Sequence, residues 1–264
     1  MLCCMVTAAT ESHAFNISVG ASSWFSWWEP FWLKKKGVFE RSDFNVNPGL
    51  LYGPILTLEL NEKIHISSIF FFGQFKMKGY RASYLGEFNY SKISTYIMRY
   101  DSDTFMTYSI LEYIKLIAGF KFLEFQYEYK QKLYYSSLYF TKKVKNKFDE
   151  YCPAAGLSVS VPIIKDVFYL IISQSVLYAM GYTFSMDAFE LKMPWRSPDK
   201  MTNRIGLNSG LNLSVMFKKV NIALTFGGRY QYFHIVKSNR SVSAYGSKDD
   251  HFAGINASFV YMVF

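Results

Sequence analysis

The chain has 264 residues and a formal net charge of +9; half of its residues are hydrophobic and 19% are aromatic. It contains no run of about 18 consecutive apolar residues, so the sequence gives no signal for a transmembrane helix. A basic balance can indicate nucleic-acid binding, but the lysines gather in expected loops, at 34–36 and 142–147, without an aromatic-basic motif. Nucleic acid is therefore not an expected partner.

The N-terminal residues 1–14 are expected to be the remnant of a secretory signal peptide. They are apolar and end in Ser12-His13-Ala14, a small-x-Ala pattern, although the usual basic region is missing. A disordered N-terminal tail is the alternative. Residues 15–264 are then expected to form a single domain, in which Cys152 has no cysteine left to pair with.

Alternation of apolar and polar residues predicts strands, because successive side chains of a strand point to opposite faces. The first strands are predicted at about 15–25, 47–60 and 63–76, with a tight turn at Asn61-Glu62. A tryptophan cluster is taken to break the first alternation and is interpreted as the place where a barrel wall leaves a bilayer. It comprises Trp24, Trp27, Trp28 and Trp32. Long loops are predicted at about 26–45 and 77–90.

A long hairpin is predicted at 92–129, with its turn near 111–113. On its first arm Arg99, Asp101 and Asp103 share one face, whereas Met98, Tyr100 and Met106 share the other. A charged face opposite an aromatic and aliphatic face is what a membrane-spanning barrel strand needs. A loop rich in Lys and Tyr is predicted to follow at 130–148.

Further strands are predicted at about 151–162, 167–184, 204–217, 220–232 and 250–264, with longer loops at 185–202 and 238–249. The total is about ten strands, joined by short turns on one side and longer loops on the other. This pattern predicts an all-β fold, a transmembrane antiparallel up-and-down β-barrel. A soluble β-sandwich fits less well, because its strands are shorter and their outward face is polar.

The chain ends in FVYMVF, with Val260, Met262 and Phe264 at alternate positions. This ending resembles the terminal signal that the barrel-assembly machinery recognises in bacterial outer-membrane proteins. The resemblance implies a Gram-negative outer-membrane location, with periplasmic termini and extracellular long loops. It also implies that machinery, outer-membrane lipid and lipopolysaccharide as partners.

The charged residues expected to face the lumen are the main candidate functional residues. Asp103 should lie opposite Lys121, because the residue numbers of paired residues in an antiparallel hairpin add up to a constant, here twice the number of the turn residue Glu112. Two interpretations stay open: a lumen filled by neutralising charges, in a structural or surface-binding protein, or a narrow porin-like channel. The set comprises Arg99, Asp101, Asp103, Lys115, Lys121, Arg204 and Arg229.

An enzymatic alternative rests on a second resemblance. The pair Asp101 and Asp103, taken with Asp249 and His251, is similar to the active site of omptin proteases, which implies activation of a water by an Asp pair and an Asp–His dyad. The match departs in topology, because the Asp-x-His pair of omptins belongs to the fourth outer loop and here it opens the last strand. The non-enzymatic interpretation is preferred.

No cofactor or metal site is expected from the sequence. The four histidines are scattered at positions 13, 65, 234 and 251, and Cys152 has no histidine near it in sequence. No glycine-rich phosphate loop precedes a helix.

Overall fold

The computed structural model describes residues 16–30, 34–36, 40–84, 88–135, 138–189, 194–196, 200–238 and 248–263. The expected leader at 1–14, Trp32, most of the expected loop at 238–249, and Phe264 lie outside these residues. Apart from a 3-10 turn at Lys218–Val220, the regular elements of the described residues are strands. None of these residues forms a helix that is long and apolar enough to cross a membrane.

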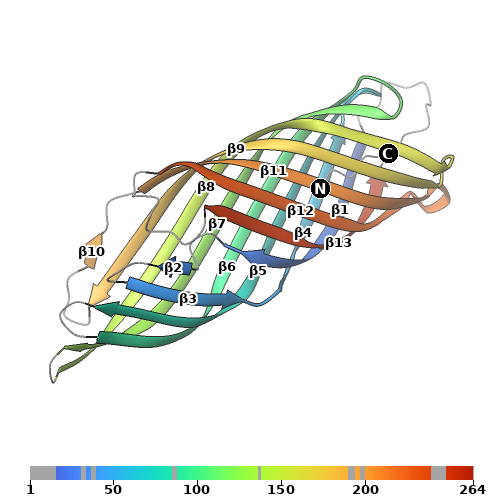
Figure 1. The fold of residues 1–264 in the computed structure, drawn as a ribbon. Coiled ribbons are helices and arrows are strands. Elements are labelled where there is room, and N and C mark those ends of the chain that lie inside the picture. Colours follow the sequence, from blue (N-terminus) through green and yellow to red (C-terminus); the bar gives the residue numbers. More distant parts are fainter. Residues whose placement is uncertain are drawn as a thin grey trace.

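Ten long strands close into an antiparallel barrel within the described residues, which confirms the predicted fold class (Figure 1). The ring closes between β1 and β13, paired from Ile17 with Val263 to Glu29 with His251. The ten strands are β1 (Asn16–Glu29), β4 (Gly49–Glu59), β5 (Ile64–Tyr84), β6 (Phe88–Ser109), β7 (Ile114–Tyr135), β8 (Leu138–Ile164), β9 (Phe168–Phe189), β11 (Lys200–Phe217), β12 (Ile222–Ser238) and β13 (Asp249–Val263).

Three short strands extend this ring at one end. β3 (Glu40–Val46) continues the line of β4 and pairs with residues Met77–Ser83 of β5. β2 (Lys34–Lys36) pairs with β3. β10 (Pro194–Arg196) pairs with β9. We call this end the rim. The opposite end, called the turn end, carries the short connections at 60–63, 110–113, 165–167 and 218–221.

The strands run further toward the rim than the sequence predicts. β5 and β6 stay paired up to Tyr84 and Phe88, and β7 and β8 up to Tyr135 and Leu138. The expected loops at 77–90 and 130–148 are therefore wrong: both segments are mostly strand. β3 likewise occupies part of the expected loop at 26–45, and β9 extends to Phe189 into the expected loop at 185–202.

The predicted alternation of faces holds over the lower barrel, near the turn end. Val19, Leu56 and Phe70 are exposed on the outer surface, whereas Ser18, Thr57 and Ser67 are buried in the lumen. Two bands of exposed aromatic side chains border this outer surface, as membrane barrels require at the two interfaces. The rim-side band includes Trp27, Tyr52, Phe72, Tyr100, Tyr151, Tyr178 and Tyr230; the turn-side band includes Tyr108, Tyr113, Phe217 and Tyr261.

The tryptophans of β1 correct the sequence interpretation. The alternation does not break at Trp24 but continues to Glu29, so Trp24 and Trp28 share the inward phase of Ser22 and are buried. Of the three described tryptophans in this run, Trp27 alone is exposed on the outer surface. The sequence interpretation failed because indole side chains suit both an interfacial belt and a packed lumen.

Beyond the rim-side aromatic band, the polarity of the two faces reverses. On β5 the outward residues become polar at Gln74 and Lys78, while Phe75 and Met77 point inward and are buried. On β6, Ile93 and Ile97 replace the inward charges found lower on the strand. The upper barrel is thus built like a soluble β-protein, with an apolar core inside and polar residues outside.

Candidate functional site in the barrel lumen

Asp103 lies at the centre of a buried ion network between the two halves of the barrel. It faces Lys121 directly across the β6–β7 ladder, in the register that the sequence predicts. The Lys121 ammonium is 2.6 Å from Asp103 Oδ1, and Arg229 Nη2 is 2.5 Å from Oδ2. One carboxylate therefore joins strands on opposite sides of the lumen, because β6 and β12 are not neighbours in the ring.

Asp101 continues the network toward the rim. Its Oδ2 accepts a hydrogen bond from Arg99 Nη2 at 2.7 Å, and its Oδ1 is 3.0 Å from the Lys121 ammonium. Arg99 also donates to Gln231 Oε1 at 3.3 Å. Arg99, Asp103 and Lys121 are 0% exposed, so these contacts form away from solvent.

A second group of charges, missed by the sequence analysis, surrounds Arg204. Its Nε donates to Glu150 at 2.6 Å, its Nη2 donates to the same carboxylate, and its Nη1 donates to Asp250 at 2.5 Å. Glu150 fell just before a predicted strand and Asp250 at a predicted strand end. The alternation of faces could have revealed them, because Glu150 points to the same face as the buried Cys152, and Asp250 to the same face as the buried Phe252.

The two groups together balance their charge. Arg99, Lys121, Arg204 and Arg229 supply four cations, and Asp101, Asp103, Glu150 and Asp250 supply four carboxylates, so the formal sum is 4 − 4 = 0. A buried charge is costly unless it is paired and hydrogen-bonded. The ion pairs meet the charge part of this requirement, whereas Arg99 Nε, Arg99 Nη1 and Arg229 Nη1 have no hydrogen-bond partner among the described residues.

An aromatic layer covers the network on the side of the rim. The Trp28 ring stacks on Phe125 and on Phe252, with ring centroids 4.7 Å and 4.9 Å apart. The Arg99 guanidinium lies 3.6 Å from the centre of the Phe252 ring, a cation–π contact. Trp28 Nε1 donates to Asp250 at 2.8 Å, so the aromatic layer and the ions form one packed unit.

The lumen near the turn end has a different lining. Lys115, on the same face of β7 as Lys121, lies opposite Ser109 and Ser158 and is buried there. Buried hydroxyl side chains are frequent at this end of the lumen, beside the buried Glu59 and His65. Thr57 and Ser67 form a hydrogen bond of 2.9 Å. The buried hydroxyl residues of this region include Ser18, Thr57, Ser67, Thr107, Ser158, Ser160, Ser214 and Thr225.

The four residues of the protease alternative lie on two faces of the wall. Asp101 and Asp103 point into the lumen, whereas Asp249 and His251 have the outward phase of β13, opposite to that of the buried Asp250 and Phe252. Asp249 pairs with His234 at 2.7 Å and accepts a hydrogen bond from Tyr232 at 2.7 Å. His251 Nδ1 lies 3.0 Å from the Tyr230 hydroxyl.

The residues of the expected assembly signal lie at the end of β13. Val260 is buried and Met262 is partly buried, and both share the inward phase. Phe264 lies outside the described residues. Among those residues, no group of three or more His, Cys, Asp or Glu side chains is arranged to hold a metal ion.

No protein-family model matches this sequence, and no curated protein sequence matches it. Solved structures do match. The outer membrane protease OmpT from Escherichia coli gives a TM-score of 0.60 at 13% identity, covering 97% of this chain and 100% of that chain. The translocator domain of the autotransporter NalP from Neisseria meningitidis gives 0.47 at 10% identity, covering 95% and 89%. The toluene transporter TbuX from Ralstonia pickettii gives 0.38 at 9% identity, covering 95% and 89%. The chain thus has the fold of the bacterial outer-membrane β-barrels, and at these identities the likeness concerns the fold alone.

Proposed function

We propose that this protein is a non-enzymatic outer-membrane barrel whose lumen is closed by its own side chains, and that it acts as a surface-exposed structural or binding protein. The observation that carries this proposal is the ion network around Asp103 with the aromatic layer above it. A solute crossing the barrel would have to break contacts between Asp103, Lys121 and Arg229, which are at most 4% exposed. This favours the filled lumen over the narrow channel.

The direction of insertion follows from the asymmetry of the two ends. Short connections gather at the turn end, as they do at the periplasmic end of outer-membrane barrels, and the strands extend furthest at the rim. We therefore place the rim outside the cell and both termini in the periplasm. Lys78→Cys on β5 should then react with an impermeant thiol reagent on intact cells, and Lys218→Cys at a turn should not. The reverse pattern would refute this orientation.

Lysines on the outer surface just above the aromatic band support lipopolysaccharide as a partner. Lys76 lies opposite Tyr96 across the β5–β6 ladder, and Lys78 and Lys92 lie on the same outer face. Cations at this height meet the phosphates of an anionic headgroup layer. Barrel-assembly machinery and outer-membrane lipid remain the other partners that we propose.

The conductance of the purified barrel in planar bilayers tests the closed lumen. The wild-type protein should give no stable current steps, because its lumen is packed at the level of Asp103. The double variant Trp28→Ala/Phe252→Ala, which removes two stacked rings of the plug, should raise the frequency of openings. Trp27→Ala is the matched control, because Trp27 is the neighbouring indole on the outer surface.

A stable ohmic conductance of the wild-type protein would overturn the proposal and favour the porin-like channel. The omptin-like alternative makes a different demand, because it needs Asp101, Asp103, Asp249 and His251 around one water. Their division between the lumen and the outer face favours the non-enzymatic function. Cleavage of peptides by the wild-type protein, lost in Asp101→Asn, would favour the protease instead.

A further inference from the structure

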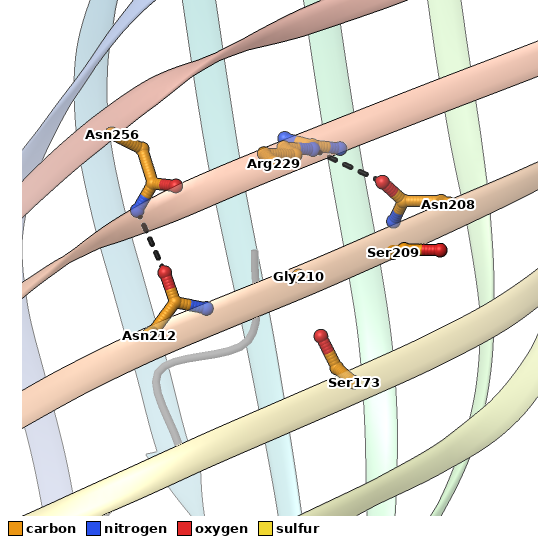
Figure 2. A pocket seen from close by; sticks show the side chains of 7 residues that line it. All are labelled: Ser173, Asn208, Ser209, Gly210, Asn212, Arg229 and Asn256. Atoms are coloured by element: carbon orange, nitrogen blue, oxygen red, sulfur yellow. Dashed lines mark hydrogen bonds between the residues drawn. The ribbon is translucent and has the colours of Figure 1, made fainter.

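A small polar cavity lies in the lumen wall, on the turn-end side of the ion network (Figure 2). Its volume is about 10 Å³, which is room for about one water-sized particle. Four strands contribute to it: β9, β11, β12 and β13. The lining residues are Ser173, Asn208, Ser209, Gly210, Asn212, Arg229 and Asn256.

The hydrogen bonds around the cavity fix the orientation of the Asn208 amide. A guanidinium group can only donate, so the 3.1 Å bond from Arg229 Nε identifies the Asn208 atom as its oxygen. Gln231 donates to the same oxygen at 3.3 Å, since its own oxygen accepts from Arg99. The Asn208 oxygen is thus occupied, and its amide N–H₂ group is left to donate elsewhere.

The oxygen of Asn212 is also hydrogen-bonded in this structure. Its oxygen accepts a hydrogen bond from Asn256 Nδ2 at 2.9 Å, which leaves the Asn212 N–H₂ group as a donor (Figure 2). The Ser173 hydroxyl lies on the neighbouring β9 and points toward Gly210 in the same view. Two amide N–H₂ groups from β11 and a hydroxyl group from β9 therefore line the space beside Gly210, which has no side chain.

Arg229 adds positive charge to this set of donors. Its Nη1 is buried and has no hydrogen-bond partner among the described residues, although its Nε and Nη2 are both bound. Its ion-pair partner, Asp103, is shared with Lys121, so one carboxylate faces two cations. Lys121 in turn pairs with Asp101, so within this group the three cations Arg99, Lys121 and Arg229 share two carboxylates.

We propose that this cavity binds a single halide-sized monovalent anion, held by the guanidinium of Arg229 and the amide N–H groups of Asn208 and Asn212. The space has room for about one water-sized particle, which a monatomic ion matches better than phosphate or a carboxylate. A cation is disfavoured by the positive charge of Arg229, whose side chain lines the space. In the lumen of this barrel, the anion completes the hydrogen bonding of a buried guanidinium.

Glycine at position 210 makes the space available. A Cβ atom built there would lie 2.8 Å from Ser173 Oγ and 3.3 Å from Asn212 Nδ2, both side-chain atoms. Gly210→Ala would therefore occupy the cavity with a methyl group without striking the backbone. Gly228→Ala is the matched control, because the nearest atom to a Cβ at position 228 is 3.8 Å away and this residue has the outward phase of β12.

The test compares thermal unfolding of the detergent-solubilised protein in sodium chloride and in sodium gluconate at equal ionic strength. For a dissociation constant of about one tenth of the chloride concentration, bound chloride shifts the folding equilibrium by about 11-fold. We expect a higher melting temperature in chloride for the wild type and for Gly228→Ala, and equal melting temperatures in the two salts for Gly210→Ala.

Equal melting of the wild type in both salts, or a chloride effect that survives Gly210→Ala, would overturn the proposal. Because Gly210→Ala can fail to fold, wild-type crystals grown in sodium bromide provide the second measurement. An anomalous bromide peak beside Arg229 Nη1 is expected there. Electron density for a water without an anomalous signal would show that the cavity is merely hydrated, and would also overturn the proposal.

Discussion

The lower and upper halves of this barrel are built from the same strands, but polar and apolar side chains exchange faces between the two halves. On β7, the lower part turns Phe120 outward and Lys121 inward, whereas the upper part turns Glu128 outward and Phe125 inward. Lipid outside requires the first arrangement, and water outside requires the second. We therefore place the membrane surface at the level where the polarity reverses.

This comparison also shows where the ion network lies relative to the two halves. Arg99, Asp101 and Asp103 lie directly below the apolar residues of the upper core, so the ion network separates that core from a lower lumen lined by hydroxyl and apolar side chains. Cation–π contacts bridge that boundary, as between Arg99 and Phe252.

The largest effect is expected for Asp103→Ala in the boundary layer. The change removes the carboxylate shared by Lys121 and Arg229 and leaves two buried cations without this partner. Breaking such a pair costs about 3–5 kcal/mol of the free energy of unfolding. Urea unfolding in lipid vesicles, followed by tryptophan fluorescence, measures it; Asp249→Ala, at the outer surface, is the control. Equal stabilities of the two variants would contradict the role of the network.

A lysine introduced on the outer face of β7 should distinguish the two halves by depth. Phe120→Lys places a charge in the lipid-facing surface, where it costs about 2–4 kcal/mol at mid-depth. Glu128→Lys lies on the same face of the same strand, eight residues further toward the rim, where we expect a cost near zero. The same unfolding assay compares them. Similar losses for both would place the membrane surface elsewhere.

Most of the fold could be predicted because the lower barrel gives a strong signal. Lipid on one side and a polar lumen on the other produce a clear period-two pattern, and the Asp103–Lys121 register followed from the turn position alone. The pattern weakens at the rim, where the polarity reverses and the outer face becomes rich in Lys and Glu. The segments at 77–90 and 130–148 then resembled loops, although their backbones continue the ladders.

The candidate site was predicted only in part, for a related reason. Arg99, Asp101, Arg204 and Arg229 were recognised because their phase is the polar one. Their partner Glu150 lay beside a segment taken as a loop. Contacts across the lumen, such as Arg229 with Asp103, join strands that are far apart in sequence, so no local pattern reveals them.

A smaller effect is expected from removing one methyl group in the upper core. Ile97 is fully buried in that core, and Ile97→Val should lower the free energy of unfolding by about 0.5–1.5 kcal/mol. Ile205→Val makes the same change on the lipid-facing surface, where lipid can fill the space and we expect little effect. If Ile97→Val is also neutral, the upper interior is not a packed core.

The smallest effect concerns pH and the outer-face contacts of Asp249. Hydrogen bonds from His234 and from the Tyr232 hydroxyl hold the pKa of this carboxyl below its usual range, and His251 adds a further favourable interaction. Because the folded-state pKa is depressed, the charged carboxylate stabilises the fold above the unfolded-state pKa of about 3.9, and this contribution disappears as the pH falls through the folded-state value. The side chain is partly exposed, so solvent screening keeps the gain small.

Asp249→Asn should therefore melt slightly below the wild type at pH 7, and the two melting temperatures should converge as the pH approaches 3. The lumen carboxylates are the same in both proteins, so their titration cancels in the difference. A gap that is constant from pH 7 to pH 3 would show that the Asp249 charge contributes nothing.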